Sequence, residues 1–192
     1  MAVALLPAQL AWYATGRFYK SEDGKLADYG YFLHLPFVPG PMFEGDGPPS
    51  ETTAHFTFAA HPFTACGATN GDLSLGLDPE GRFSLHVQHK PAGNFGDPHS
   101  FGHGKRIAVF RRTSLVVGTT VGSIVGTNVF SAHLIESTPF EFAGHQYDLA
   151  NHMGFGVTQF GTASETPVMP PPNGYTLVLP FTGSAIALGE VA

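Results

Sequence analysis

Charged residues are scarce in this chain of 192 amino acids, and their scarcity limits what the protein can bind. They make up 12% of the sequence, against about 25% in an ordinary globular protein. There are 9 Lys and Arg residues in all, and the formal net charge is -6. The one basic concentration, Lys105 to Arg112, alternates with apolar residues like an exposed strand. A nucleic-acid partner is therefore not expected.

Cysteine and apolar leader segments are also nearly missing. Cys66 is the single cysteine, so no disulfide can form within the chain. The opening residues MAVALLPAQLAW lack the basic start and long apolar run of a signal peptide. No stretch reaches the length of a membrane helix. We therefore expect a cytoplasmic protein without a membrane partner.

Most catalytic signatures are missing too. The sequence contains no phosphate-binding glycine loop, no GxSxG, no HExxH and no paired CxxC. No window shows helical periodicity with capping residues at both ends. These absences favour an all-β protein that needs no cofactor.

Alternating apolar residues, by contrast, run through most of the chain. The stretch from 127 to 160 predicts three strands of an antiparallel meander: Asn128–Glu136, Phe140–Leu149 around Ala143 and Gly144, and Phe155–Phe160. Further strands are predicted at Leu10–Tyr19, Tyr29–Leu35, Glu51–Ala60, Arg106–Arg112, Ser114–Val125 and Tyr175–Phe181, with a tail pairing at Ser184–Leu188. The Tyr29–Leu35 strand is apolar on both faces, which is typical of a strand covered on two sides.

Turns and loops separate these strands. Asp78 to Arg82 contains Pro and Gly at tight-turn positions and predicts a hairpin between Leu73–Leu77 and Phe83–His89. Residues Ser21 to Lys25 predict a polar turn with Gly24 at a position of positive φ. The loop Pro36–Ser50 carries Phe37, Met42 and Phe43, which favours a lid or a packed cap.

These features together predict one all-β domain over residues 1–192. About ten strands and 17 Phe residues indicate a single antiparallel barrel of about eight to ten strands with an apolar interior. So few charges remain for the outer surface that we expect a homo-oligomer.

The candidate site consists of polar residues that share a strand face with apolar ones. Such side chains, if buried, need hydrogen bonds or line a pocket. We expect catalytic roles for Tyr31, His89 and Arg111. The expected ligand-binding residues are Trp12, Tyr29, Asn128, Phe130, Glu136, Phe155 and Gln159. A Phe-rich cavity with a few orienting polar groups is typical of a small-molecule site.

A register shift of one residue would turn the opposite face inward. The alternative set is then His34, His55, His86 and His133, with Glu44 from the 36–50 loop. Histidines in such numbers suit acid–base chemistry or a metal, although the close HxH pairing of many cupins does not occur here. We expect no bound metal, and a metal-dependent enzyme stays open as an alternative.

The segments TNVFSAHL and FEFAGHQYDL, within a meander that covers nearly the whole chain, resemble those of calycin-type barrels. These are the lipocalins and the allene oxide cyclase-like barrel enzymes. The resemblance implies a barrel with an interior ligand. The lipocalin GxW motif is missing, because Leu10 and Ala11 precede Trp12, so no family residue is carried over.

The function expected from these patterns is a cofactor-free cyclase or isomerase that acts on an apolar small molecule held in the barrel. The first alternative is a non-catalytic barrel that binds an apolar ligand. The second is the metal-dependent, histidine-based enzyme.

Overall fold

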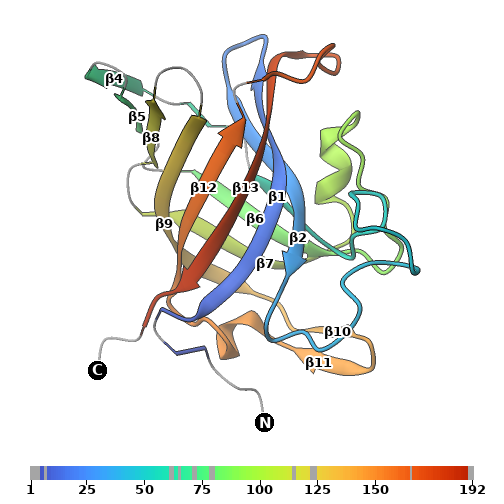
Figure 1. The fold of residues 1–192 in the computed structure, drawn as a ribbon. Helices are drawn as coiled ribbons and strands as arrows, with labels where there is room; N and C mark the ends of the chain where they lie inside the picture. The colour runs from blue at the N-terminus through green and yellow to red at the C-terminus, as the bar shows by residue number, and fades with distance from the viewer. Residues whose placement is uncertain are drawn as a thin grey trace.

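Eight strands close into an antiparallel barrel in the computed structural model (Figure 1). The structure describes residues 5–6, 8–60, 63–64, 66–70, 73–77, 81–113, 116–121, 125–164 and 166–189. The barrel strands are β1 (Leu10–Ser21), β2 (Leu26–His34), β3 (Phe56–Ala60), β6 (Arg82–Val87), β7 (Lys105–Arg112), β9 (Val125–Ser137), β12 (Gly156–Ser164) and β13 (Tyr175–Ala187). They pair in the order β12-β13-β1-β2-β3-β6-β7-β9.

The pairing of β9 with β12 closes the barrel. It runs from Gly156 opposite His133 to Ser164 opposite Val125. Closure leaves these eight strands without a free sheet edge. The predicted antiparallel barrel with a Phe-rich interior is confirmed, and its strand number is the lower end of the expected range.

Three more strands extend the sheet beyond the first half of β9. They are β8 (Val116–Val121), β5 (Leu73–Leu77) and β4 (Cys66–Asn70), paired in that order. The expected hairpin between β5 and β6 is wrong: β5 pairs with β4 and β8, whereas β6 pairs with β3 and β7. The turn motif could not reveal this, because partner choice among many similar strands is a tertiary property. The turn itself, residues 78–80, lies outside the described residues.

The expected meander from 127 to 160 also needs correction. β9 pairs directly with β12, and the segment between them forms a separate hairpin of β10 (Phe140–Phe142) and β11 (His145–Tyr147). Its two-residue turn has positive φ at Ala143 (50°) and Gly144 (78°), as a tight hairpin requires. A short 3-10 turn, η2 (Leu149–Asn151), follows and leads back to the barrel.

This hairpin helps to plug the barrel at the end where the two termini lie (Figure 1). The ring of Phe56 on β3 packs 4.8 Å from Phe142 and 6.0 Å from Phe140, centroid to centroid. The 36–50 loop joins the plug: Phe37 stacks on His152 at 4.6 Å, and Met42 packs on the same core. The predicted packed cap is therefore present, at the end of the barrel that carries the termini.

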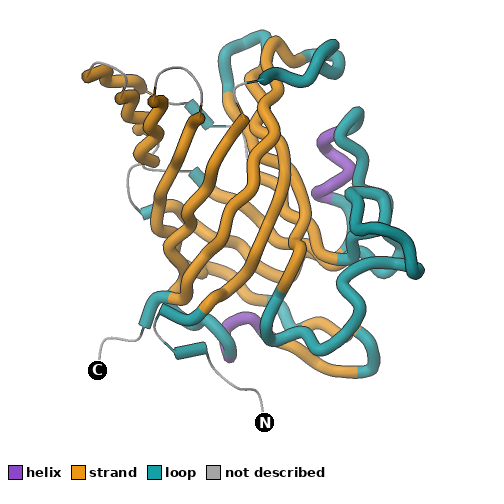
Figure 2. The backbone as a smooth tube through the Cα atoms, viewed as in Figure 1, coloured by secondary structure: helices purple, strands orange, loops and turns teal. Residues whose placement is uncertain are grey.

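A second apolar layer covers the outside of β2 and β3. The loop from Gln88 to Gly104, which contains the 3-10 turn η1 (Pro98–Gly102), lies over these strands, as Figure 2 shows. Thr57 donates a hydrogen bond to the carbonyl of Phe101 at 2.7 Å, and Gln88 donates one to that of Ser100 at 3.0 Å. Both faces of β2 are thus covered, as its sequence predicts.

β1 and β2 approach each other closely where glycines face one another. Gly16 pairs with Gly30, and a Cβ built on Gly30 would lie 2.2 Å from the Thr15 carbonyl oxygen and 2.7 Å from the Phe58 ring. A larger residue has no room there, so Phe58 packs directly over the glycine backbone.

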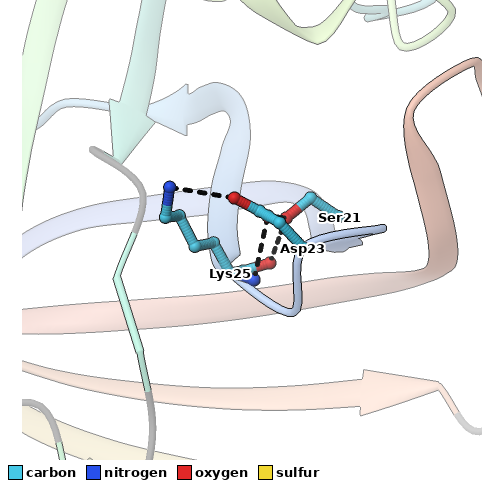
Figure 3. Close-up of polar contacts among 3 residues, drawn as sticks. All are labelled: Ser21, Asp23 and Lys25. Atoms are coloured by element: carbon cyan, nitrogen blue, oxygen red, sulfur yellow. Dashed lines mark hydrogen bonds and ion pairs between the residues drawn. The ribbon is translucent and has the colours of Figure 1, made fainter.

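The turn from Ser21 to Lys25 joins β1 to β2 at the end of the barrel remote from the termini (Figure 1). Figure 3 shows the polar contacts among Ser21, Asp23 and Lys25 in this turn. The Asp23 carboxylate accepts hydrogen bonds from the Ser21 hydroxyl and the Lys25 backbone, and it pairs with the Lys25 ammonium at 2.9 Å. These donors, Ser21 foremost, lower the pKa of Asp23 to about 2. Gly24 has a φ of 82°, which confirms the predicted turn.

Within the described ranges, no helix has the length and apolar character needed to cross a membrane.

Candidate functional site

The barrel encloses a cavity of about 350 Å³ near the β1–β2 turn. This volume lies at the lower end of the range for small-molecule pockets, about 300–1,000 Å³. Ten of the lining residues are aromatic or leucine: Trp12, Phe18, Leu26, Phe32, Phe58, Phe63, Phe83, Phe130, Leu179 and Phe181. The wall is therefore mainly apolar and aromatic.

One ion pair interrupts this apolar wall. Arg112, at the end of β7, donates from Nη2 to Oδ2 of Asp28 on β2 at 2.9 Å. The Arg112 side chain is 3% exposed and that of Asp28 is 20% exposed. β3 and β6 separate the two strands in the sheet, so the pair joins residues from non-adjacent staves of the barrel.

Aromatic rings hold the Arg112 guanidinium in place. Its Cζ lies 4.5 Å from the centroid of Phe63, 4.9 Å from that of Phe130 and 5.9 Å from that of Phe83. Cations lying over ring faces are attracted by the ring quadrupole, more strongly where water is excluded. The guanidinium is thus oriented by its surroundings as well as by Asp28.

Burial raises the pKa of the Asp28 carboxyl above its usual value, although the neighbouring Arg112 acts in the opposite direction. Desolvation disfavours a charged carboxylate, and here it outweighs the attraction of the guanidinium. A carboxyl whose pKa is raised by burial is common among catalytic acids and bases.

A second polar interaction in the cavity wall is a side-chain hydrogen bond that joins β1 to β12. Trp12 Nε1 donates to Gln159 Oε1 at 2.8 Å, and Gln159 Nε2 donates to the carbonyl of Phe160 at 2.9 Å. A Cβ on Gly183 would lie 2.3 Å from Gln159 Nε2, so glycine is needed beside this amide. The Gln159 amide is thus occupied in fixing the Trp12 indole.

Four of the residues predicted to bind a ligand line this cavity: Trp12, Asn128, Phe130 and Gln159. They come from β1, β9 and β12, which the closure of the barrel brings together. Trp12, Ala14 and Phe18 have the spacing of one strand face, and all three line the cavity.

Tyr29 and Tyr31 lie on the opposite face of β2, in the layer covered by the 88–104 loop. Tyr29 contacts the rings of Tyr19 and His99, and Tyr31 contacts Phe43 and Phe95. Burial raises the pKa of both phenols. The inward face of β2 instead carries Asp28 and Phe32. The expected orientation of this strand is thus reversed, because both its faces are apolar and alternation alone could not choose between them.

The remaining predicted residues lie at the surface. His89, Arg111 and Phe155 are exposed, and Glu136 forms an exposed ion pair with Arg106 at 3.0 Å. The β7–β9 pairing skips Ile135 between Leu134 and Glu136, and this irregularity displaces the alternation predicted for Glu136. β7 has buried apolar residues on both faces, so alternation alone could not choose its inward face, and Arg112, not Arg111, shares the cavity side with Phe110.

The alternative histidine set is dispersed over the barrel. His55 Nδ1 bonds the Gln88 carbonyl at 2.9 Å, His86 Nε2 bonds the Ser84 hydroxyl at 2.9 Å, and His133 contacts the Phe155 ring. His34 and Glu44 are exposed. Among the residues that the structure describes, no group of three or more His, Cys, Asp or Glu side chains is placed to hold a metal ion.

Sequence reasoning missed Asp28 and Arg112. Asp28 directly precedes the predicted strand Tyr29–Leu35, and Arg112 belongs to the basic group from Lys105 to Arg112 that was expected to be exposed. One signal was available in the sequence: Asp28 has the same alternation as Phe32, and the oppositely charged Arg112 has the same alternation as Phe110.

Comparison of the chain with models of protein families, with curated proteins and with solved structures finds no match to any of them.

Proposed function

We propose that this protein takes up a small apolar molecule in the barrel cavity, with the Asp28–Arg112 pair as the polar anchor. The supporting observation is a 350 Å³ aromatic cavity whose wall contains a single buried ion pair among the described residues. Few convergent polar groups in an apolar pocket are the general form of a small-molecule site. The resemblance to calycin-type barrels agrees with an interior ligand at the level of fold only.

Binding can be followed through Trp12, the single tryptophan of the chain, which lines the cavity. The neutral fluorophore N-phenyl-1-naphthylamine is expected to quench Trp12 emission saturably, with a Kd on the order of 10 µM or lower, about -7 kcal/mol. Binding is driven by the transfer of the apolar fluorophore from water to the aromatic wall of the cavity.

Two variants that each introduce a Phe side chain on β12 test the location of the probe. Ala163 lines the cavity, and its neighbour Thr162 is exposed on the outer face of β12. Ala163→Phe is expected to weaken the affinity for the fluorophore at least ten-fold, and Thr162→Phe less than two-fold. Equal effects of the two substitutions, or an absence of saturable quenching, would contradict the proposal.

A second candidate is catalysis of a cofactor-free isomerisation or cyclisation, favoured by the raised pKa of Asp28 inside the cavity. Asp28 would move a proton, and Arg112 would stabilise the oxyanion that forms on the substrate. The roles expected for Tyr31, His89 and Arg111 stay predictions that the cavity geometry does not support.

Proton transfer can be tested with an apolar ketone that fits the cavity. In D₂O the protein is expected to raise deuterium incorporation at C2 of 1-tetralone at least ten-fold over buffer. Asp28→Asn should abolish this increase, because the amide cannot accept the proton. A 1-tetralone recovered unlabelled while it saturably quenches Trp12 would favour the carrier function.

The remaining expectations also stand as proposals. β9, β12 and β13 are neighbours in the barrel and contain one charged residue in their sequences, Glu136. An uncharged face of this extent supports the expected homo-oligomer, because two acidic chains can meet there without like-charge repulsion. A cytoplasmic location and the lack of nucleic-acid and membrane partners remain predictions.

A further inference from the structure

Only one of the two oxygens of the Asp28 carboxylate accepts a hydrogen bond from the described part of the chain. Oδ2 accepts from Arg112 at 2.9 Å, whereas Oδ1 accepts no hydrogen bond from the residues described. The side chain is 20% exposed and lines the cavity. A carboxylate in apolar surroundings gains considerably from each donor that reaches it. The cavity therefore presents an acceptor that suits a hydroxyl donor.

The charge of the site selects against ionised ligands. Asp28 and Arg112 together are neutral, and the rest of the described lining carries no charge. A carboxylate ligand would add an unbalanced negative charge beside Asp28, and an amine would add a positive one beside Arg112. Unbalanced charges away from water are costly. A neutral molecule leaves the pair intact.

We infer that the cavity prefers neutral apolar alcohols or phenols, whose hydroxyl donates to Oδ1 of Asp28. This inference rests on the proposed function, because it names the ligand class of the same cavity. The hydroxyl lies beside the ion pair, and the hydrocarbon part packs among the rings of Trp12, Phe32 and Phe58.

Three probes of matched ring shape test the inference at pH 7: 2-naphthol, 2-methylnaphthalene and 2-naphthoate. Each is titrated against the wild-type protein with quenching of Trp12 emission as the readout. The Kd of 2-naphthol is expected to be at least ten-fold lower than that of 2-methylnaphthalene. The Kd of 2-naphthoate is expected to exceed both.

Removal of the whole pair should remove the preference. Asp28→Leu together with Arg112→Met replaces two buried charges by apolar groups, a change that often preserves folding. In this variant the Kd values of 2-naphthol and 2-methylnaphthalene should agree within two-fold. The matched control, Glu136→Leu with Arg106→Met, removes an exposed pair of 3.0 Å and should keep the ten-fold preference.

The outcomes separate the two proposals. If none of the three probes quenches Trp12 saturably, the proposed function fails and the inference fails with it. If 2-methylnaphthalene binds and 2-naphthol binds no more tightly, the inference alone is overturned. Tightest binding by 2-naphthoate also overturns it, since Arg112 would then be the anchor. A preference that persists in the Asp28→Leu, Arg112→Met protein would place the hydroxyl elsewhere and likewise overturn it.

Discussion

Arg112→Met is expected to lower the free energy of unfolding by about 3–5 kcal/mol at pH 7, because it leaves the Asp28 carboxylate buried without its counter-charge. The shape of the side chain is largely kept, so the loss reports the charge more than the packing. Arg112 is 3% exposed and lies among three Phe rings. Urea unfolding monitored by circular dichroism measures the change.

The double variant Asp28→Leu with Arg112→Met is the control for this prediction. It should unfold within about 1–2 kcal/mol of wild type, since no unpaired charge remains. A double variant as unstable as the single one would show that the packing of Arg112, and not its charge, stabilises the barrel.

The loss of unfolding free energy caused by Arg112→Met should also depend on pH. Burial raises the folded-state pKa of Asp28, whereas the unfolded value is about 3.9. A group whose pKa is raised in the folded state contributes most to the free energy of unfolding below its unfolded-state pKa. This contribution is lost as the pH rises through the folded-state pKa. The gap to wild type is therefore expected to be smaller at pH 4 than at pH 8, and a gap that widens on acidification would contradict this assignment.

Phe110→Ala is expected to cost about 3–5 kcal/mol of unfolding free energy. Phe110 on β7 is 0% exposed, stacks on Phe83 at 5.1 Å and meets Trp12 edge-on at 5.6 Å. Truncation leaves a hole at the centre of the barrel and loses both ring contacts. The midpoint and slope of urea unfolding give the change.

The exposed Phe160 on β12 offers a matched control for Phe110. It is 46% exposed on the outer face, so Phe160→Ala is expected to cost about 1 kcal/mol or less. If the two substitutions cost the same, the ring cluster inside the barrel would not be the main source of stability.

Most strand positions were predicted, because alternation is a local property, although β4 (Cys66–Asn70) was not among them. Trp12, Ala14 and Phe18 have the spacing of one strand face, and β1 places all three on the cavity wall. Gly24 and the pair Ala143–Gly144 mark turns whose backbone angles these residues permit, and both turns are present. The predicted strand ends differ by a few residues, since strand length depends on the partner strand.

Strand partners and inward faces could be predicted only in part. The turn after Leu77 is a good hairpin signal, yet β5 and β6 belong to different parts of the sheet. β2 has apolar residues on both faces, and only the loop over Tyr29 and Tyr31 determines that Asp28 faces inward. The face of a strand buried on two sides depends on what covers it, which is distant in sequence.

The sequence by itself determined an all-β barrel with an aromatic interior, because period-two alternation, abundant Phe and few charges are enough for that choice. It also indicated four residues of the cavity wall. The tertiary structure alone decided which charges meet inside. Asp28 and Arg112 are 84 positions apart, and only closure of the barrel excludes water from both and makes each the partner that the other requires.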